Sequence, residues 1–211
     1  MTAARSGRAL PMSFYDRPTE QVARDLLGAV LECTTPLGTA SGRIVETEAY
    51  LGPDDPACHA VAGLTERTRN LHGPPGIAYV YFIYGVHWCF NAVTREEGHG
   101  SAVLVRAVEP LAGVDLMRER RGNVRRDVDL TNGPGKLCQA LGIDGAMDGT
   151  RLTQPPLRIL AAPPVEDGDV EITPRIGITR AADWPLRWLV RGNPYVSATR
   201  PRSTKPRRRS V

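Results

Sequence analysis

Two carboxylates and a phenol share one face of a predicted strand. The segment Thr39–Tyr50 is predicted to be a strand, and its period-two alternation places four side chains on one face: Ile44, Glu46, Glu48 and Tyr50. A face that mixes carboxylates with an isoleucine and a tyrosine suits neither solvent nor an apolar core. A single strand carboxylate is usually solvated or ion-paired, so Glu46 by itself indicates nothing about function. The combination predicts the wall of a cleft.

An aromatic stretch, Tyr79–Asn91, supplies a second candidate wall. It predicts two strands on either side of a hairpin turn at Tyr84-Gly85, namely Tyr79–Ile83 and Val86–Val93. The turn places the ring of Tyr84 at a hairpin tip, where a small polar residue is usual, so we expect this ring to project from the protein. Tyr81 is expected to point into the interior of a concave sheet. The other large rings are expected in the core: Tyr79 and Trp88.

A strand predicted over Ser101–Glu109 carries Arg106 on a face that is otherwise apolar. Burying a guanidinium group requires a partner for its charge. An ion pair with Glu46 or Glu48 would meet that need, and so would a bound phosphate. The pattern leaves both alternatives open.

Further positive charge gathers in two places. The segment Asn132–Gly142 predicts a glycine-rich start to a short helix, whose free amides and Lys136 could bind a phosphate, although it lacks the spacing of a nucleotide-binding P-loop. The net charge of the chain is +4, and six positive charges fall within residues 200–211, so residues 1–199 carry 4 − 6 = −2. We expect this basic tail to be disordered. It either attracts nucleic acid non-specifically or serves solubility.

The elements that must position these residues form a mixed α and β pattern. Residues 1–12 are expected to be disordered. Helices are predicted over Asp16–Gly28, with Pro18 in the first turn, and over Leu111–Arg121. Further strands are predicted over Ala29–Cys33, Leu157–Ala161, Val170–Ile178 and Leu186–Val190. The long loop of residues 51–77 has no periodicity, and its place between the two walls predicts that it covers or lines the cleft.

Length and composition indicate one soluble globular domain, over residues 13–199. The chain has 211 residues, 41% of them hydrophobic and 24% charged. Its sequence has no apolar run long enough to span a bilayer and no signal-peptide pattern, so we expect a cytoplasmic protein. The four cysteines show neither a CxxC pair nor metal-finger spacing, which predicts reduced thiols and no metal site.

Several motifs in order resemble the alkyladenine (3-methyladenine) DNA glycosylase family, from about Phe14 to Ser197. They are Arg43-Ile-Val-Glu-Thr-Glu-Ala-Tyr-Leu-Gly-Pro, His59, Tyr79-Val-Tyr-Phe-Ile-Tyr-Gly, Asn91, Val105-Arg-Ala-Val-Glu-Pro, Gly133-Pro-Gly-Lys-Leu-Cys-Gln-Ala-Leu and Arg191-Gly-Asn-Pro-Tyr-Val-Ser. The resemblance implies an α+β fold: a single domain with a curved, largely antiparallel sheet flanked by helices. It also implies a monofunctional enzyme that flips alkylated or deaminated purines out of duplex DNA, cuts the N-glycosidic bond and starts base excision repair. No metal or cofactor is implied, and we expect a monomer.

Carried over residue by residue, the resemblance implies the following roles. Glu48 matches the general base that activates water, and Arg106 matches an arginine beside the pocket that contacts the DNA backbone. Tyr50, His59 and Tyr81 match the residues that stack on the flipped base, and Asn91 matches the residue that disfavours guanine. Tyr84 matches the ring inserted into the minor groove, and Ser197 resembles a further backbone contact. Better-known members have methionine and tyrosine where this chain has Val86 and His87, and Cys58 replaces a smaller or polar residue.

Two other functions compete with this reading. Glu46 and Glu48 could form the carboxylate pair of a carbohydrate-acting hydrolase, although two residues on one strand rarely flank a bond from opposite sides. Alternatively, the chain could be a non-catalytic DNA-binding module that uses the Tyr84 hairpin and the basic tail. That alternative leaves the carboxylate-bearing face unexplained.

Overall fold

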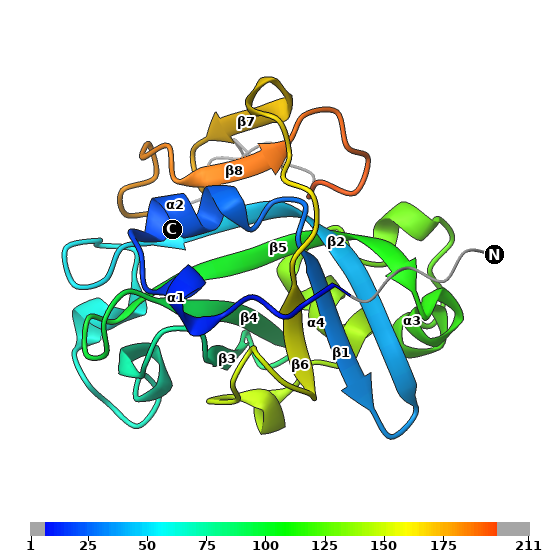
Figure 1. The fold of residues 1–211 in the computed structure, drawn as a ribbon, viewed down its shortest axis with the longest axis horizontal. Helices are drawn as coiled ribbons and strands as arrows, with labels where there is room; N and C mark the ends of the chain where they lie inside the picture. The colour runs from blue at the N-terminus through cyan, green and yellow to red at the C-terminus, as the bar shows by residue number, and fades with distance from the viewer. Residues whose placement is uncertain (1–6, 198–211) are drawn as a thin grey trace, which may run out of the picture.

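The longest strand, β2 (Gly38–Tyr50), organises the sheet in the structure, a computed structural model that describes residues 7–197 (Figure 1). Its first half pairs with β1 (Val30–Thr35), and its second half pairs with β8 (Arg187–Val190). Along its other edge it pairs with β5 (Ser101–Ala112). Side chains on β2 can therefore reach groups from three different strands.

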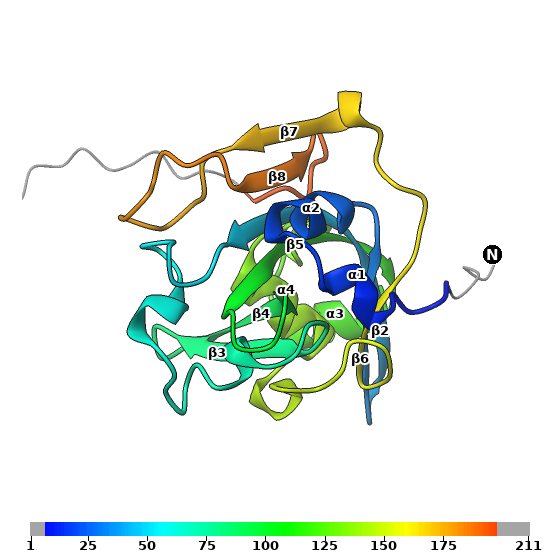
Figure 2. The ribbon, with the colours of Figure 1, turned by 60° about the vertical axis from the view of Figure 1, so that its left-hand side comes forward.

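Eight antiparallel strands form one sheet, in the order β3-β4-β5-β2-β1-β6, with β8 beside β2 and β7 beside β8. The strands not yet given are β3 (Ala78–Ile83), β4 (His87–Thr94), β6 (Leu157–Leu160) and β7 (Val170–Thr173). Figure 2 shows the β7–β8 hairpin at the top and the β3–β4 hairpin below it, with the sheet curving between them. The predicted α+β class, with one domain and a largely antiparallel sheet, is confirmed.

Helices flank this sheet. In the described residues they are α1 (Met12–Tyr15), α2 (Thr19–Asp25), α3 (Val114–Arg121) and α4 (Pro134–Leu141). Single 3-10 turns are η1 (His59–Ala62), η2 (Asn70–His72), η3 (Asp127–Asp129), η4 (Gly145–Met147) and η5 (Asp167–Asp169). Helix α2 packs on β2 and β5, α4 packs on β4 and β5, and α3 packs against α4. None of the helices in residues 7–197 is long and apolar enough to cross a membrane.

Two predicted helices differ from the observed ones at their ends. Pro18 precedes α2 as its N-cap residue instead of lying in its first turn, and α2 ends at Asp25. Strand β5 continues to Ala112, and Gly113 then adopts a φ of 72° before α3 begins. The helix predicted from Leu111 therefore starts three residues late, because the end of β5 stays paired with β2.

The register of β2 against β5 shifts on both sides of Glu46. These irregularities leave Val45 and Arg106 without a partner residue across the two strands. An extra residue in one strand turns the side chains that follow it to the opposite face. Ile44 therefore packs in the main core, and its predicted place on the carboxylate face is wrong. Three predicted residues do share that face: Glu46, Glu48 and Tyr50.

Part of the N-terminal segment predicted to be disordered has a defined place in the structure. Residues 7–12, which the sequence patterns assign to a disordered segment, have ordered backbone contacts. The N–H of Leu10 donates to the carbonyl of Ile159 at 2.8 Å, and Ala9 forms an isolated bridge with Leu160. Residues 1–6 and 198–211, which include the predicted basic tail, lie outside the described residues.

Gly42 lies where β2 and β5 approach each other closely, next to a register shift. A Cβ at this position would lie 2.7 Å from Val108 Cγ2 and 2.9 Å from the carbonyl oxygen of Glu109. Because the neighbours belong to the sheet itself, we expect Gly42→Ala to lower the free energy of unfolding by about 1–3 kcal/mol. Chemical denaturation measures the change.

Gly168 provides the matched control, because nothing lies within 4 Å of a Cβ added there. Gly168→Ala is expected to change stability by about 0.5 kcal/mol or less, as surface substitutions usually do. Equal stability of the two variants would contradict the close approach at Gly42.

Candidate active site

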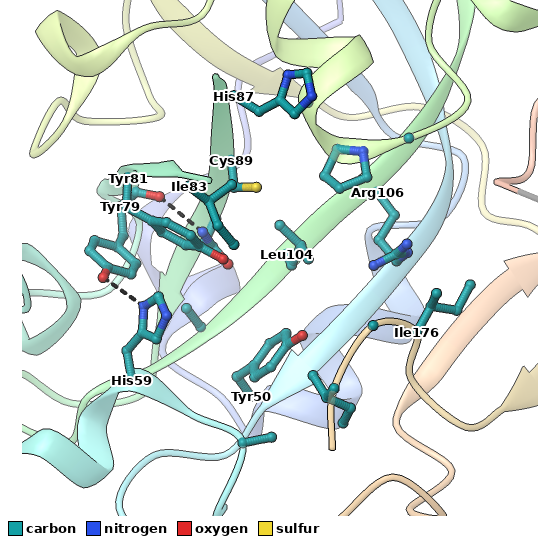
Figure 3. Close-up of a pocket in the computed structure, with 18 of the residues that line it drawn as sticks. Tyr50, His59, Tyr79, Tyr81, Ile83, His87, Cys89, Leu104, Arg106 and Ile176 are labelled. Atoms are coloured by element: carbon teal, nitrogen blue, oxygen red, sulfur yellow. Dashed lines mark hydrogen bonds between the residues drawn. The ribbon is translucent and has the colours of Figure 1, made fainter. Parts of the chain in front are cut away.

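A cavity of about 400 Å³ opens between the carboxylate face of β2 and the β3–β4 hairpin (Figure 3). Its walls come from β2, β3, β4, β5, the start of α4, the loop of residues 51–77 and the connection between β7 and β8. Figure 2 shows that the loop after β2 and the β7–β8 connection lie on the same side of the molecule. The prediction that the long loop lines the cleft is therefore confirmed. Pockets of this size bind small organic groups.

Three rings form one wall of the cavity. Tyr79 and Tyr81 point into it from alternate positions of β3, and His59 joins them from η1 (Figure 3). The rings of His59 and Tyr81 lie 4.6 Å apart at 66°, and Nδ1 of His59 is hydrogen-bonded to the hydroxyl of Tyr79 at 2.9 Å. Tyr50 faces the cavity from β2, across from these rings. The pocket thus offers flat apolar faces on two sides.

These rings carry no charge of their own at neutral pH. Burial lowers the pKa of His59, and the charge of Arg67 lowers it further, so the imidazole is neutral at pH 7. Burial raises the pKa of Tyr79 to about 12, against the opposing charge of Arg67. Burial, followed by the charge of Glu48, raises the pKa of Tyr50 well above its ordinary value.

Glu48 lies directly beneath the cavity surface and is fully buried. Its Oε2 accepts from the hydroxyl of Tyr50 at 2.9 Å and lies 3.2 Å from Nη1 of Arg106. Its Oε1 accepts from the N–H of Ile176 at 2.7 Å. All three partners line the cavity, so the carboxylate is held in place by groups that a bound ligand would touch.

Glu46, two residues earlier, is also fully buried. Its carboxylate accepts from Nε of Arg106 at 3.1 Å and from Nε of Arg187 at 2.6 Å. The backbone N–H and the hydroxyl of Ser197 each donate to it at 2.7 Å. Both oxygens are occupied inside the protein, which argues against Glu46 and Glu48 as a carboxylate pair on a sugar. Ser197 lies in this buried cluster, not on the protein surface.

Arg106 joins the two carboxylates, so the predicted ion pair forms with both Glu46 and Glu48. Burial opposes its charge, but Glu48 and Glu46 outweigh that effect and raise the pKa of the guanidinium. It is only 7% exposed, although it lines the cavity. The guanidinium therefore contacts both the cavity and Glu48, and it fixes the orientation of that carboxylate.

Two polar groups lie at the edges of the cavity. Asn91, on β4, is buried and donates through Nδ2 to the carbonyl of Tyr79 at 3.1 Å. Lys136 lies in the first turn of α4, and its Nζ donates to Oδ1 of Asn132 at 2.6 Å. His87 lies against the same turn, because a Cβ on Gly135 would come within 2.8 Å of its ring. The β3–β4 hairpin is thus supported by α4.

The hairpin tip has the exposed ring that the sequence predicts. Tyr84 and Gly85 occupy the turn with φ angles of 55° and 69°, and the N–H of Val86 donates to the carbonyl of Ile83. A tyrosine with positive φ is unfavourable by roughly 1–3 kcal/mol relative to a relaxed residue. Its ring is 81% exposed, so packing does not offset this strain. Neither folding nor packing explains a tyrosine here.

Sequence reasoning missed several groups at the site. Tyr79 is buried in a core cluster, as predicted, but it also lines the cavity and is hydrogen-bonded to His59. The period-two relation to Tyr81 could have indicated this second role. Arg175 gave no signal. It lies 4.7 Å from the Tyr50 ring and pairs with buried Asp55 at 2.5 and 2.8 Å, which joins the loop after β2 to the β7–β8 connection.

The cysteines and other metal-ligating residues do not form a metal centre in residues 7–197. No group of three or more His, Cys, Asp or Glu side chains in this part of the chain is arranged to hold an ion. All four cysteines are free and buried, and two of them line the cavity: Cys58 and Cys89.

Comparison with known proteins gives consistent matches over nearly the whole chain. The family model of methylpurine-DNA glycosylase matches residues 13–194. A protein of Salinibacter ruber is 52% identical over 204 residues, covering 91% of this chain and 98% of its own length. One from Methanoculleus marisnigri is 51% identical over 191 residues, covering 89% and 98%, and one from Chlorobaculum parvum is 45% identical over 202 residues, covering 95% and 96%. All three are named "putative 3-methyladenine DNA glycosylase".

The buried cluster predicts that Glu46 is required for stability. Glu46→Gln removes the charge that balances Arg106 and Arg187, and leaving a buried charge unpaired costs about 3–5 kcal/mol. We expect a loss of this size in the free energy of unfolding, measured by chemical denaturation. Asp115→Asn is the control, because its carboxylate is 97% exposed and pairs with Arg118 on the surface. A loss below about 1 kcal/mol for Glu46→Gln would contradict the role of the cluster.

Proposed function

The chain belongs to the methylpurine-DNA glycosylase family, and on that premise we propose that it releases damaged purines of the 3-methyladenine type from duplex DNA. The reaction is hydrolysis of the N-glycosidic bond and leaves an abasic site for base excision repair. The observation that carries the proposal is a carboxylate, Glu48, fixed beneath a pocket walled by flat aromatic rings. This arrangement suits a planar base above a group that activates water.

The base must leave the helix before it can reach such a pocket. Extrusion costs a few kcal/mol in lost stacking and pairing, which a wedge and a stacking pocket help offset. Tyr84 is the wedge: its exposed, strained ring fills the gap that the base leaves. Tyr50 stacks on one side of the extruded base, and His59 and Tyr81 stack on the other. Asn91, fixed by its bond to Tyr79, disfavours the 2-amino group of guanine.

Glu48 acts as the general base. A carboxylate offers about four lone-pair positions; hydrogen bonds from Tyr50 and Ile176 use two of them, and Arg106 adds an ion pair at 3.2 Å. We propose that a remaining position binds the attacking water. Water oxygen bonds to C1′ as the bond from C1′ to the purine nitrogen breaks, and Glu48 takes the water proton. Its negative charge also stabilises the oxocarbenium character of the sugar. A cationic alkylated purine leaves as a neutral base and needs no added proton, whereas a neutral purine such as hypoxanthine takes up one proton from water as it leaves.

The one lysine within residues 7–197 lines the cavity, but its amine is engaged in a hydrogen bond, and we do not propose it as a nucleophile. The chain has two lysines, Lys136 and Lys205, and the described one is bonded to Asn132 at the cavity edge. We therefore propose a monofunctional enzyme that acts as a monomer, in which Lys136 contacts a phosphate of the DNA. Arg106 orients Glu48 through their ion pair, and Ser197 accepts a hydrogen bond from Arg106 in the same buried cluster.

The decisive experiment measures release of free base from duplex oligonucleotides that contain hypoxanthine or an alkylated adenine. We expect the wild type to release base and Glu48→Gln to release at least about a thousandfold less, because removal of an essential catalytic group costs this much or more. DNA binding by Glu48→Gln should be retained. Loss of binding and release together would show a structural role for Glu48, and tight binding without release by the wild type would favour a non-catalytic DNA-binding module.

The strained turn generates a second prediction. Tyr84→Gly relieves an unfavourable φ, so we expect its free energy of unfolding to rise by about 1 kcal/mol. Because the wedge is lost, base release from duplex DNA should fall by about tenfold or more, while release from single-stranded DNA changes little. Equal losses on both substrates would show that Tyr84 serves the chemistry and not extrusion.

A further inference from the structure

We propose that Arg67 is a specificity-determining residue that shifts the enzyme toward neutral damaged purines and away from cationic ones. The inference rests on the proposed function, since it concerns which bases the pocket accepts. A guanidinium group lies on the outer side of the aromatic wall formed by His59, Tyr79 and Tyr81. Stacking of a base on these rings does not require such a charge.

Arg67 belongs to the loop of residues 51–77. Its guanidinium carbon lies 5.6 Å from the centre of the Tyr81 ring, and its Nη2 donates to the carbonyl of Phe82 at 3.4 Å. It lines a second, outer cavity that shares Cys58 and His59 with the base pocket. Tyr81 lines only the base pocket and Arg67 only the outer cavity, so the guanidinium approaches the Tyr81 ring from outside the base pocket.

The charge of Arg67 is not balanced by a carboxylate. Arg175, which lies over the Tyr50 ring, pairs with Asp55, so its charge is neutralised where it acts. Arg67 forms no ion pair with any carboxylate of residues 7–197. Of these two guanidinium groups, only that of Arg67 therefore presents a net positive charge to the pocket wall.

This charge acts on a bound base in two ways. A guanidinium over one face of a tyrosine draws on the same ring electrons that attract a cation to the other face. It also repels a second positive charge directly. Its field reaches two of the three rings of the wall, because Arg67 lowers the pKa of His59, after burial, and opposes the rise in the pKa of Tyr79. A neutral purine is subject to neither penalty and stacks on the same rings.

Solvent limits how strongly the charge of Arg67 can change the ratio of cationic to neutral base release. Arg67 is exposed, so water and salt screen its charge. We therefore expect Arg67→Gln to raise the ratio of cationic to neutral base release about threefold to fivefold, which corresponds to about 0.7–1 kcal/mol. A loss of DNA affinity alone would lower release of both classes and leave this ratio unchanged.

The experiment measures single-turnover release at saturating enzyme. The cationic substrate is duplex DNA methylated with dimethyl sulfate, from which 3-methyladenine and 7-methylguanine are scored; the neutral substrates are duplexes with hypoxanthine or ethenoadenine. Arg67→Lys keeps the charge and should keep the wild-type ratio. Arg69→Gln is the matched control, because Arg69 is exposed on the same loop and lies over no ring in the described part of the chain.

A ratio that rises in Arg67→Gln, but not in Arg67→Lys or Arg69→Gln, supports the inference. An unchanged ratio in Arg67→Gln overturns it, and so does an equal change in Arg67→Lys, since the charge would then not be responsible. A wild type that releases only cationic bases also overturns it. Failure of the wild type to release either class would instead overturn the proposed function, and the inference with it.

Discussion

The site depends on one constraint: two carboxylates on the same face of β2 must be buried, and their charges must be balanced. Arg106 from β5 bridges Glu46 and Glu48, and Arg187 from β8 completes the balance at Glu46. Because these partners come from the strands on either side of β2, the charge cluster also holds three strands in register. The backbone and hydroxyl of Ser197 bring the end of the described chain into the same cluster. Both carboxylates are fully buried, but only Glu48 has partners that all line the pocket.

A second buried ion pair joins the loops above this cluster. Asp55 and Arg175 hold the loop after β2 against the β7–β8 connection, and Arg175 also donates to the carbonyl of Ala49 at 2.9 Å. The next residue, Ile176, supplies the amide that binds Glu48. The placement of Glu48, the proposed general base, therefore depends on a contact between segments about 120 residues apart in the chain. The aromatic wall, by contrast, is built mostly from neighbouring positions of β3.

The carboxylate cluster and the hairpin tip differ in exposure. The carboxylate cluster is buried and densely hydrogen-bonded, which suits a group that must be preorganised before the substrate arrives. The hairpin tip exposes a strained tyrosine, which suits a group that works outside the protein, within the DNA. Arg67 lies between the two, on the outer side of the wall, where its charge can influence binding without contact with the base.

The sequence by itself determined the features that depend on local order. Period-two alternation predicted the strands and the shared face of Glu46, Glu48 and Tyr50, and the Tyr84-Gly85 turn predicted an exposed ring, because both follow from backbone geometry over a few residues. Motifs in register indicated the family. Only the tertiary structure decided that Ile44 turns to the core and that all of the partners of Glu48, but not all of those of Glu46, line the pocket. It alone placed Arg187 against Glu46, Arg175 over the Tyr50 ring and Arg67 over the Tyr81 ring. These outcomes depend on β-bulges and on contacts between distant segments, which no local pattern encodes.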